Sequence, residues 1–180
     1  CYVMDRVVPE TDETDQDERI LCFDAATGEP KWQRQYDAPY VGVGYVAGPR
    51  ASVTVVDGRA YAIGTMGHTH CLNAETGEIV WARDLDADYE ISAAKRMPIW
   101  GIAGSPLVYE DKVILHIGGN DGACIVALNI ENGQEVWRAL HDRAQYSSPV
   151  LVTQNGNDVI VCWTGDSVAG INPADGSVWW

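Results

Sequence analysis

The sequence predicts an all-β protein built from repeated units of four short antiparallel strands. A twelve-residue pattern occurs four times, as "LCFDAATGEPKW", "HCLNAETGEIVW", "VALNIENGQEVW" and "AGINPADGSVWW". Apolar runs rich in Val, Ile and Tyr precede the later copies and are separated by "DGR", "EDK" and "NGND", which indicates strand, turn and strand. The tryptophans that close the copies are 49, 56 and 43 residues apart, a spacing within reach of that of β-propeller blades.

Each copy predicts a tight turn between the third and fourth strands of its unit. A glycine stands four residues before the tryptophan, and an Asp or Asn stands four residues before the glycine. The Asp or Asn side chain can bind backbone amides two residues on, and glycine accepts a positive φ. A small residue six positions before the glycine leaves room for the indole face. The small residues are Cys22, Cys71, Ala127 and Gly170, and the glycines are Gly28, Gly77, Gly133 and Gly176.

The repeat predicts one partial propeller over residues 1–180. Its blade units cover approximately 1–37, 51–86, 104–140 and 147–180. Residues 1–8 match the second strand of a unit, so we expect about three and three-quarter blades from a ring of seven or eight. A closed four-bladed ring is the alternative, because an incomplete ring leaves sheet edges open.

The pattern resembles the PQQ-like, or quinoprotein-like, β-propeller repeat with its tryptophan-docking motif. "CFDAATGEPKW" and "CLNAETGEIVW" match that motif best, whereas the third and fourth copies lack its threonine. The resemblance covers nearly the whole chain and is specific for the fold, but the motif holds blades together and contacts no substrate. It implies stacking between neighbouring blades for Trp32, Trp81, Trp137 and Trp180.

Composition excludes some classes of partner. The formal net charge is −14, which argues against nucleic acid and anionic membrane surfaces. No apolar run reaches the length of a transmembrane segment. With 46% hydrophobic residues, the chain can bury a sizeable core.

The five cysteines show no C-x-x-C pair and no adjacent pair. Because Cys22 and Cys71 occupy the small-residue position, we favour buried thiols over disulfides or a metal site. Cys1 lies directly against a predicted strand, which disfavours a lipid anchor at that position. The family resemblance implies a periplasmic or extracellular location.

Loop lengths point to one functional face. The connections from second to third strand and the links between blades share one face, which we call the loop face, and the glycine turns lie on the opposite face. The turns barely change in length, whereas the links cover residues 33–50, 82–103 and 138–146. Variable loops on a rigid scaffold commonly carry binding, so we expect a protein partner or a small-molecule ligand there.

Two sets of residues on the loop face are candidates for a metal or a base. His68 and His70 alternate, which places both imidazoles on one side of a strand and could ligate a metal if another blade gave a third ligand. The alternative is that one caps the loop and the other lies in the sheet. Asp121 and Asp166 occupy comparable loops and could hold a cation or act as a base, or could bind turn amides instead.

A third set is a candidate clamp for a flat or anionic ligand. Arg50, Arg96, Trp100 and Tyr146 precede the innermost strands, where guanidinium and aromatic planes face the central opening of a propeller. The alternative for these residues is packing over the mouth of the channel. The acidic run from residue 10 to residue 18 lacks the ligand spacing of a calcium loop, so a solvated loop is favoured.

Two functions compete. The first is a non-catalytic scaffold for ligand or protein binding and assembly. The second is a quinoprotein dehydrogenase that oxidises alcohols or aldose sugars, for which the resemblance implies pyrroloquinoline quinone (PQQ) and calcium. The adjacent cysteine pair of the alcohol dehydrogenases in that family is absent from this sequence, which favours the scaffold. A hydrolase or sulfatase-associated sensor, in which the propeller is an accessory domain, is a third hypothesis.

Overall fold

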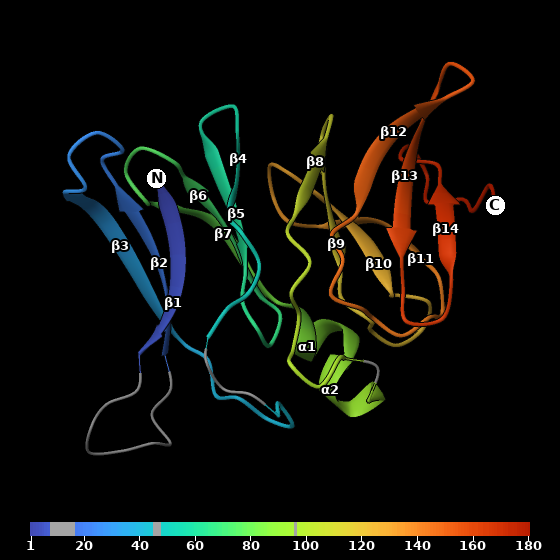
Figure 1. The fold of residues 1–180 in the computed structure, drawn as a ribbon, viewed down its shortest axis with the longest axis horizontal. Helices are drawn as coiled ribbons and strands as arrows, with labels where there is room; N and C mark the ends of the chain where they lie inside the picture. The colour runs from blue at the N-terminus through green and yellow to red at the C-terminus, as the bar shows by residue number, and fades with distance from the viewer. Residues whose placement is uncertain (8–16, 45–47, 96) are drawn as a thin grey trace.

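The computed structural model describes residues 1–7, 17–44, 48–95 and 97–180. These residues form four antiparallel sheets that stand side by side across the molecule (Figure 1). The first sheet contains β1 (Tyr2–Val7), β2 (Asp17–Phe23) and β3 (Pro30–Asp37). The second contains β4 (Thr54–Val56), β5 (Arg59–Ile63), β6 (His68–Asn73) and β7 (Ile79–Asp84). The third contains β8 (Leu107–Tyr109), β9 (Lys112–His116), β10 (Ile125–Asn129) and β11 (Glu135–Ala139). The fourth contains β12 (Val150–Gln154), β13 (Asn157–Trp163) and β14 (Val168–Ile171).

Strands pair in chain order within every sheet, so each sheet is a simple meander. The second and third sheets have four strands, as predicted for a unit, and the first has three. The all-β partial propeller is therefore confirmed. In the fourth sheet the last segment pairs with β14 through a bridge between Ile171 and Val178 and through backbone hydrogen bonds of Gly170 with Trp179 and Trp180.

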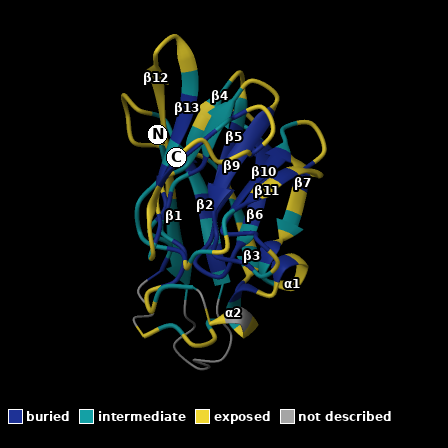
Figure 2. Ribbon diagram, turned by 90° about the vertical axis from the view of Figure 1, so that its right-hand side faces the viewer, coloured by how far each residue is buried: buried dark blue, intermediate teal, exposed yellow. Residues whose placement is uncertain are grey.

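Burial follows the position of a strand in the stack. Central strands such as β9 and β10 are covered on both faces by neighbouring sheets and are buried along almost their whole length (Figure 2). Their residues 113–115 and 125–128 are accordingly apolar without alternation. β2, in the first sheet, alternates between buried and half-buried residues instead. The core therefore lies between successive sheets.

The predicted glycine turns are confirmed. Asp24 accepts hydrogen bonds from the backbone amides of Ala26 and Thr27 at 2.9 and 3.0 Å, and Asn73 does the same for Glu75 and Thr76. The turn glycines have φ between 70° and 77°, a conformation that a Cβ disfavours. Local side-chain chemistry therefore fixes the third-to-fourth connection of each unit.

Three tryptophans reach from their own sheet to the glycine turn of the next. Trp32, Trp81 and Trp137 donate from Nε1 to the carbonyl oxygens of Ala74, Ile130 and Pro173 at 3.0, 2.8 and 3.1 Å. The indole face covers the turn glycine so closely that a Cβ on Gly77, Gly133 or Gly176 would lie within 2.8 Å of ring atoms. Within each sheet the cross-strand neighbours of the indoles are Cys22, Cys71 and Ala127.

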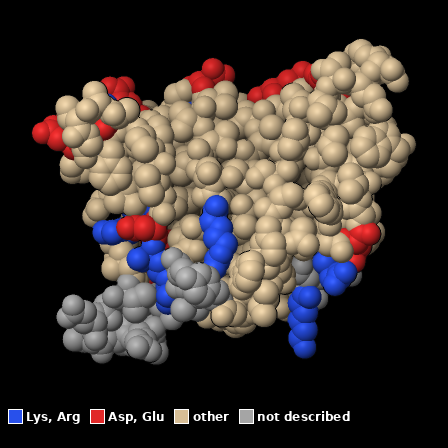
Figure 3. All heavy atoms as spheres, viewed as in Figure 1, with Lys and Arg blue, Asp and Glu red and all other residues tan. Residues whose placement is uncertain are grey.

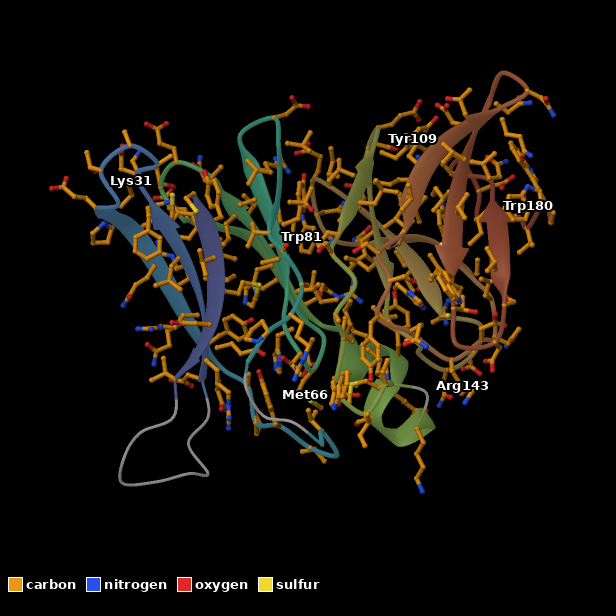
Figure 4. The ribbon with its side chains drawn as sticks, viewed as in Figure 1. Lys31, Met66, Trp81, Tyr109, Arg143 and Trp180 are labelled. Carbon is orange, nitrogen blue, oxygen red and sulfur yellow. The ribbon has the colours of Figure 1, made fainter. Side chains whose placement is uncertain are left out.

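Trp180 is arranged differently. Its indole lies against Gly170 of its own sheet and its Nε1 donates to Gln154 Oε1 at 3.0 Å. The side chain is half-exposed at the end of the stack (Figure 4). Within the described residues, Trp180 therefore makes no inter-sheet contact of the kind made by the other three.

The link between the second and third sheets contains two short helices that the sequence did not predict. They are α1 (Leu85–Tyr89) and α2 (Ile91–Ala94). Asp84 caps α1 by accepting a hydrogen bond from the Ala87 amide at 3.1 Å, which satisfies a free helix-start amide. Leu85 and Tyr89 are buried, so packing under the link stabilises a helix that is too short to be stable alone.

The cysteines are free thiols. Cys22, Cys71, Cys124 and Cys162 are buried and Cys1 is exposed. Burial raises the pKa of the Cys162 thiol to about 12, so this group stays protonated and unreactive at neutral pH. Among the described residues, no helix is both long enough and apolar enough to cross a membrane.

Candidate binding face

The loop face is the end of the molecule that carries both helices and the links between sheets (Figure 1). Met66 and Arg143 lie at this end, whereas Lys31 and Tyr109 lie at the end that carries the glycine turns (Figure 4). Link and second-to-third loops therefore share one face, as the order of strands predicts.

Three of the four predicted clamp residues come together on this face. The rings of Trp100 and Tyr146 stack with centroids 5.3 Å apart and planes 28° apart. Arg50 donates from Nη1 to the carbonyl oxygen of Trp100 at 2.7 Å. Arg96, the fourth predicted residue, lies outside the described residues. The pair joins two different links, since Trp100 precedes the third sheet and Tyr146 precedes the fourth.

Trp100 belongs to a ridge, residues 97–100, that separates two grooves. Met97 and Ile99, together with Lys95, line both of them. Ile99 is 63% exposed and Trp100 is 49% exposed. Large apolar side chains on a ridge of this kind are more exposed than folding alone requires.

The larger groove has a volume of about 580 Å³ and lies between two links. One wall is formed by Val41 and Gly42, and the other by Ser92, Ala93 and the ridge. The backbone amide of Gly44 donates to the carbonyl oxygen of Ile99 at 2.6 Å, which ties the two links together. Val41, like Ile99, is 63% exposed.

The smaller groove has a volume of about 390 Å³ and lies on the other side of the ridge. Arg143, Gln145 and Tyr146 form its far wall. Asp166 holds Arg143 in place, because its carboxylate accepts from Arg143 Nη2 at 2.6 Å and from the Arg143 backbone amide at 2.7 Å. The carboxylate of Asp166 is therefore bound to the link, as in the alternative given for it above.

Charge is distributed unevenly over the described surface. In the view of Figure 3, most acidic side chains lie along the end that carries the glycine turns, and the basic ones lie toward the loop face. Lys95 projects from the C-cap of α2 beside both grooves. Lys95 and Arg143, both basic, are the charged side chains among the described residues that line the two grooves. Within a chain of net charge −14, the grooves are therefore locally favourable for a partner with carboxylates.

Asp121 lies apart from Asp166. It lines a third cavity of about 240 Å³ with Tyr89, Glu90, Asn120 and Arg138. Its own φ is 52°, and its charge is one of the causes that raise the pKa of Arg138, after the hydrogen bond to Glu135. The two aspartates are therefore not paired around one ligand position.

His68 and His70 share one side of β6, as their spacing predicts. Both rings face Tyr36 of the first sheet, with centroid distances of 5.7 and 4.4 Å. Burial, and then the neighbouring His68, lower the pKa of His70 to about 4. The Nδ1 atoms of both imidazoles are buried without a hydrogen-bond partner among the described residues. The pair therefore lies at the seam between two sheets.

The described residues contain no group of three or more His, Cys, Asp and Glu side chains that could hold a metal ion. A metal at His68 and His70 stays a prediction. The acidic run falls mostly on residues 8–16, which lie outside the described residues. Its last two members, Asp17 and Glu18, belong to β2.

Sequence reasoning missed several residues of this face. Val41, Met97 and Ile99 are apolar residues in "YVGVG" and "KRMPIWGIAG", and an apolar run within a predicted link is the signal that was available. Glu18 was assigned to a solvated loop, but it is fully buried. Its hydrogen-bond partners are Tyr36, Tyr40 and Thr65, which are 18 to 47 residues away in the chain, so no local pattern predicts its burial.

The comparisons with known proteins agree with this architecture. A family model described as outer membrane protein assembly factor BamB matches residues 15–180. No curated protein is significantly similar to the chain in sequence.

Solved structures show the same fold at low sequence identity. BamB from Moraxella catarrhalis is similar with a TM-score of 0.58 and 19% identity, over 99% of this chain and 51% of BamB. The quinohemoprotein alcohol dehydrogenase ADHIIG from Pseudomonas putida HK5 has a TM-score of 0.59 and 17% identity, over 93% of this chain and 32% of the enzyme. The C-terminal WD40 domain of Sif2 has a TM-score of 0.56 and 12% identity, over 97% of this chain and 44% of that domain. The chain thus spans about half the length of BamB.

Proposed function

Because the chain belongs to the family of outer membrane protein assembly factor BamB, we propose that it is a non-catalytic scaffold that binds another protein through its loop face. The observation that carries this proposal is the exposed apolar ridge, residues 97–100, with a groove on each side. Exposed apolar surface with a polar rim is typical of protein–protein sites, and aromatic side chains and methionine are enriched in interface cores.

The partner that fits this surface is a protein of the outer-membrane assembly machinery that presents an apolar segment flanked by carboxylates. A protein is favoured over a small molecule because the ridge exposes the large apolar side chains of Ile99 and Trp100, and only Ile99 of the two lines the grooves. Lys95, beside both grooves, supports a partner with negative charge. The description of the family model supports a periplasmic location beside the outer membrane.

The described residues do not fit the calcium–quinone alternative. Asp121 and Asp166 lie in different loops with different partners, and no cluster of three metal-binding side chains occurs among the residues described. Calcium takes six to eight oxygen ligands. No catalytic step is therefore assigned to these side chains.

Site-specific photo-crosslinking in the source organism tests the proposal. A photo-reactive amino acid at Ile99 is expected to crosslink the full-length protein to a component of the outer-membrane assembly machinery. The same amino acid at Val55, an exposed residue of β4, is the matched control and is expected to give no such product. The substitution Val41→Asp, in the groove wall, should lower the yield at position 99 about tenfold, because it places a charge in an apolar contact.

Equal crosslinking from positions 99 and 55, or none from either, would overturn the scaffold proposal. The purified full-length protein should also be loaded with PQQ and calcium and assayed for dye-linked oxidation of alcohols and aldose sugars. Cofactor-dependent turnover would establish the dehydrogenase in place of the scaffold.

A further inference from the structure

Glu18 is a buried carboxylate that joins two sheets and a link. Its side chain accepts hydrogen bonds from the hydroxyl of Tyr36 at 2.7 Å, the hydroxyl of Tyr40 at 2.6 Å and the backbone amide of Thr65 at 3.0 Å. Glu18 lies on β2, whereas Thr65 lies in the loop between β5 and β6. Buried carboxylates are tolerated only when such hydrogen bonds replace water.

The atoms around this carboxylate are tightly packed. A Cβ on Gly64 would lie 1.9 Å from Glu18 Oε2 and 2.8 Å from the Tyr36 hydroxyl, so glycine is required there. Burial, and then Glu18, raise the pKa of Tyr36 well above its ordinary value, which keeps this hydroxyl a donor. The hydrogen bonds and the close contact with Gly64 therefore fix the positions of the Glu18 carboxylate and the Tyr36 hydroxyl.

Thr65 also contacts the residues that directly follow the ridge. Its carbonyl oxygen accepts from the Ile102 amide at 2.9 Å. A Cβ on Gly101 would lie 2.3 Å from Thr65 Cγ2 and 2.8 Å from Thr65 O. The backbone of Gly101, directly after the ridge, therefore packs closely against Thr65. The Gly101 amide also donates to Pro98 O at 2.8 Å, which closes the ridge into a turn.

Tyr40 connects Glu18 and Thr65 to the opposite wall of the larger groove. Its hydroxyl lies 2.8 Å from Thr65 Oγ1 as well as bonding Glu18. Val41, the next residue, forms the wall that faces the ridge across the groove. The Glu18 carboxylate is thus connected to the Val41 wall by its hydrogen bond with Tyr40. It is connected to the ridge by its hydrogen bond with the Thr65 amide and by the bond from the Ile102 amide to Thr65 O.

We propose that Glu18 is a positioning residue, which sets the shape of the binding surface by holding Thr65 under the ridge and Tyr40 under the opposite wall. The part that this shape plays in binding rests on the proposed function. The positioning itself does not, because it is a property of the isolated chain.

Residue-resolved amide hydrogen exchange on Glu18→Ala and Glu18→Gln tests the proposal without any partner. In the alanine variant, the amides of Thr65, Ile102 and Gly44 are expected to exchange about tenfold faster or more. The glutamine variant should stay within about threefold of the parent protein, because an amide oxygen can still accept from Tyr40 and Thr65. The amides of Ile117 and Cys124, which are hydrogen-bonded in the third sheet, are the remote controls.

Unchanged exchange at the amides of Thr65, Ile102 and Gly44 would overturn the proposal, and so would an equal increase at Ile117 and Cys124, which indicates global loosening. If Glu18→Ala does not fold, Tyr40→Phe is the second variant. It removes one hydroxyl and keeps the ring, and it should speed exchange at Thr65 and Gly44 while the remote amides stay unchanged. Crosslinking from Ile99 is measured separately, so a failure of partner binding leaves this result interpretable.

Discussion

The indole Nε1 of Trp81, in the second sheet, donates a hydrogen bond of 2.8 Å to the backbone carbonyl oxygen of Ile130 in the third sheet. The ring also covers Gly133, two ring atoms lying 2.8 Å from where a Cβ would stand. One side chain thus combines apolar packing with a directional bond across the seam.

Trp81→Ala is expected to lower the free energy of unfolding by about 3–5 kcal/mol, the usual loss for a buried aromatic side chain. Trp81→Phe should lose about 1–3 kcal/mol, because the ring remains while the carbonyl loses its donor. Trp163→Ala is the control, since Trp163 is 65% exposed, and it should change stability by less than about 0.5 kcal/mol. Denaturation with guanidinium chloride measures all three, and equal losses for Trp81→Ala and Trp163→Ala would contradict the docking role.

Gly133→Ala and Gly156→Ala form a matched pair of substitutions. Both glycines have positive φ, 70° and 81°, so each alanine carries a backbone penalty of about 1–2 kcal/mol. Only at Gly133 does the new methyl meet an indole, because nothing lies within 4 Å of a Cβ at Gly156. Gly133→Ala should therefore lower the free energy of unfolding by about 1–3 kcal/mol more than Gly156→Ala does. Indistinguishable unfolding curves would show that the indole can move aside freely.

The lowered pKa of His70 predicts that the folded protein loses stability at mildly acidic pH. Its pKa in the folded protein is about 4, below the value of about 6.5 expected in the unfolded chain. The folded state thus binds fewer protons between these two values, so this contribution is complete above pH 6.5 and is lost as the pH falls toward 4. The loss attributable to His70 reaches about 3 kcal/mol.

The measurement compares the free energy of unfolding at several pH values for the parent protein and His70→Gln. His116 also has a lowered pKa because of its burial, and it is present in both proteins, so the difference between them isolates His70. A parallel pH dependence in the two proteins would count against this assignment.

Asp84→Ala tests the cap of α1. Loss of the acceptor for the Ala87 amide should destabilise the protein by about 1 kcal/mol and speed exchange at that amide. Asp84→Asn keeps an acceptor oxygen and should be close to the parent protein in both measurements. An alanine variant with normal exchange at Ala87 would show that packing of Leu85 and Tyr89 alone forms the helix.

Local chemistry explains how much of the fold could be predicted from the sequence. The turn at Asn73 is encoded within five residues, by an acceptor side chain and a glycine at Gly77, so its position could be predicted without knowledge of the rest. The alternation of His68 and His70 likewise places both rings on one side of β6. The spacing of the repeat and the chemistry of its turns were together sufficient to predict the four antiparallel units.

The parts that were missed depend on neighbours far away in the chain. Tyr36 faces the two histidines from another sheet, and Glu18 is buried only because Tyr40 and Thr65 close over it. The helix α1 is five residues long, which is too short for its periodicity to stand out from a loop. Contacts between sheets, rather than local preference, decide each of these positions.

The acceptor for each of the three inter-sheet indoles is a main-chain oxygen, supplied by an alanine, an isoleucine and a proline in turn. Any amino acid has that oxygen, so mutation at these three sites leaves the joint chemically intact as long as the turn keeps its shape. The side chain at each of these three positions is therefore free to change without a compensating change in the sheet that supplies the indole.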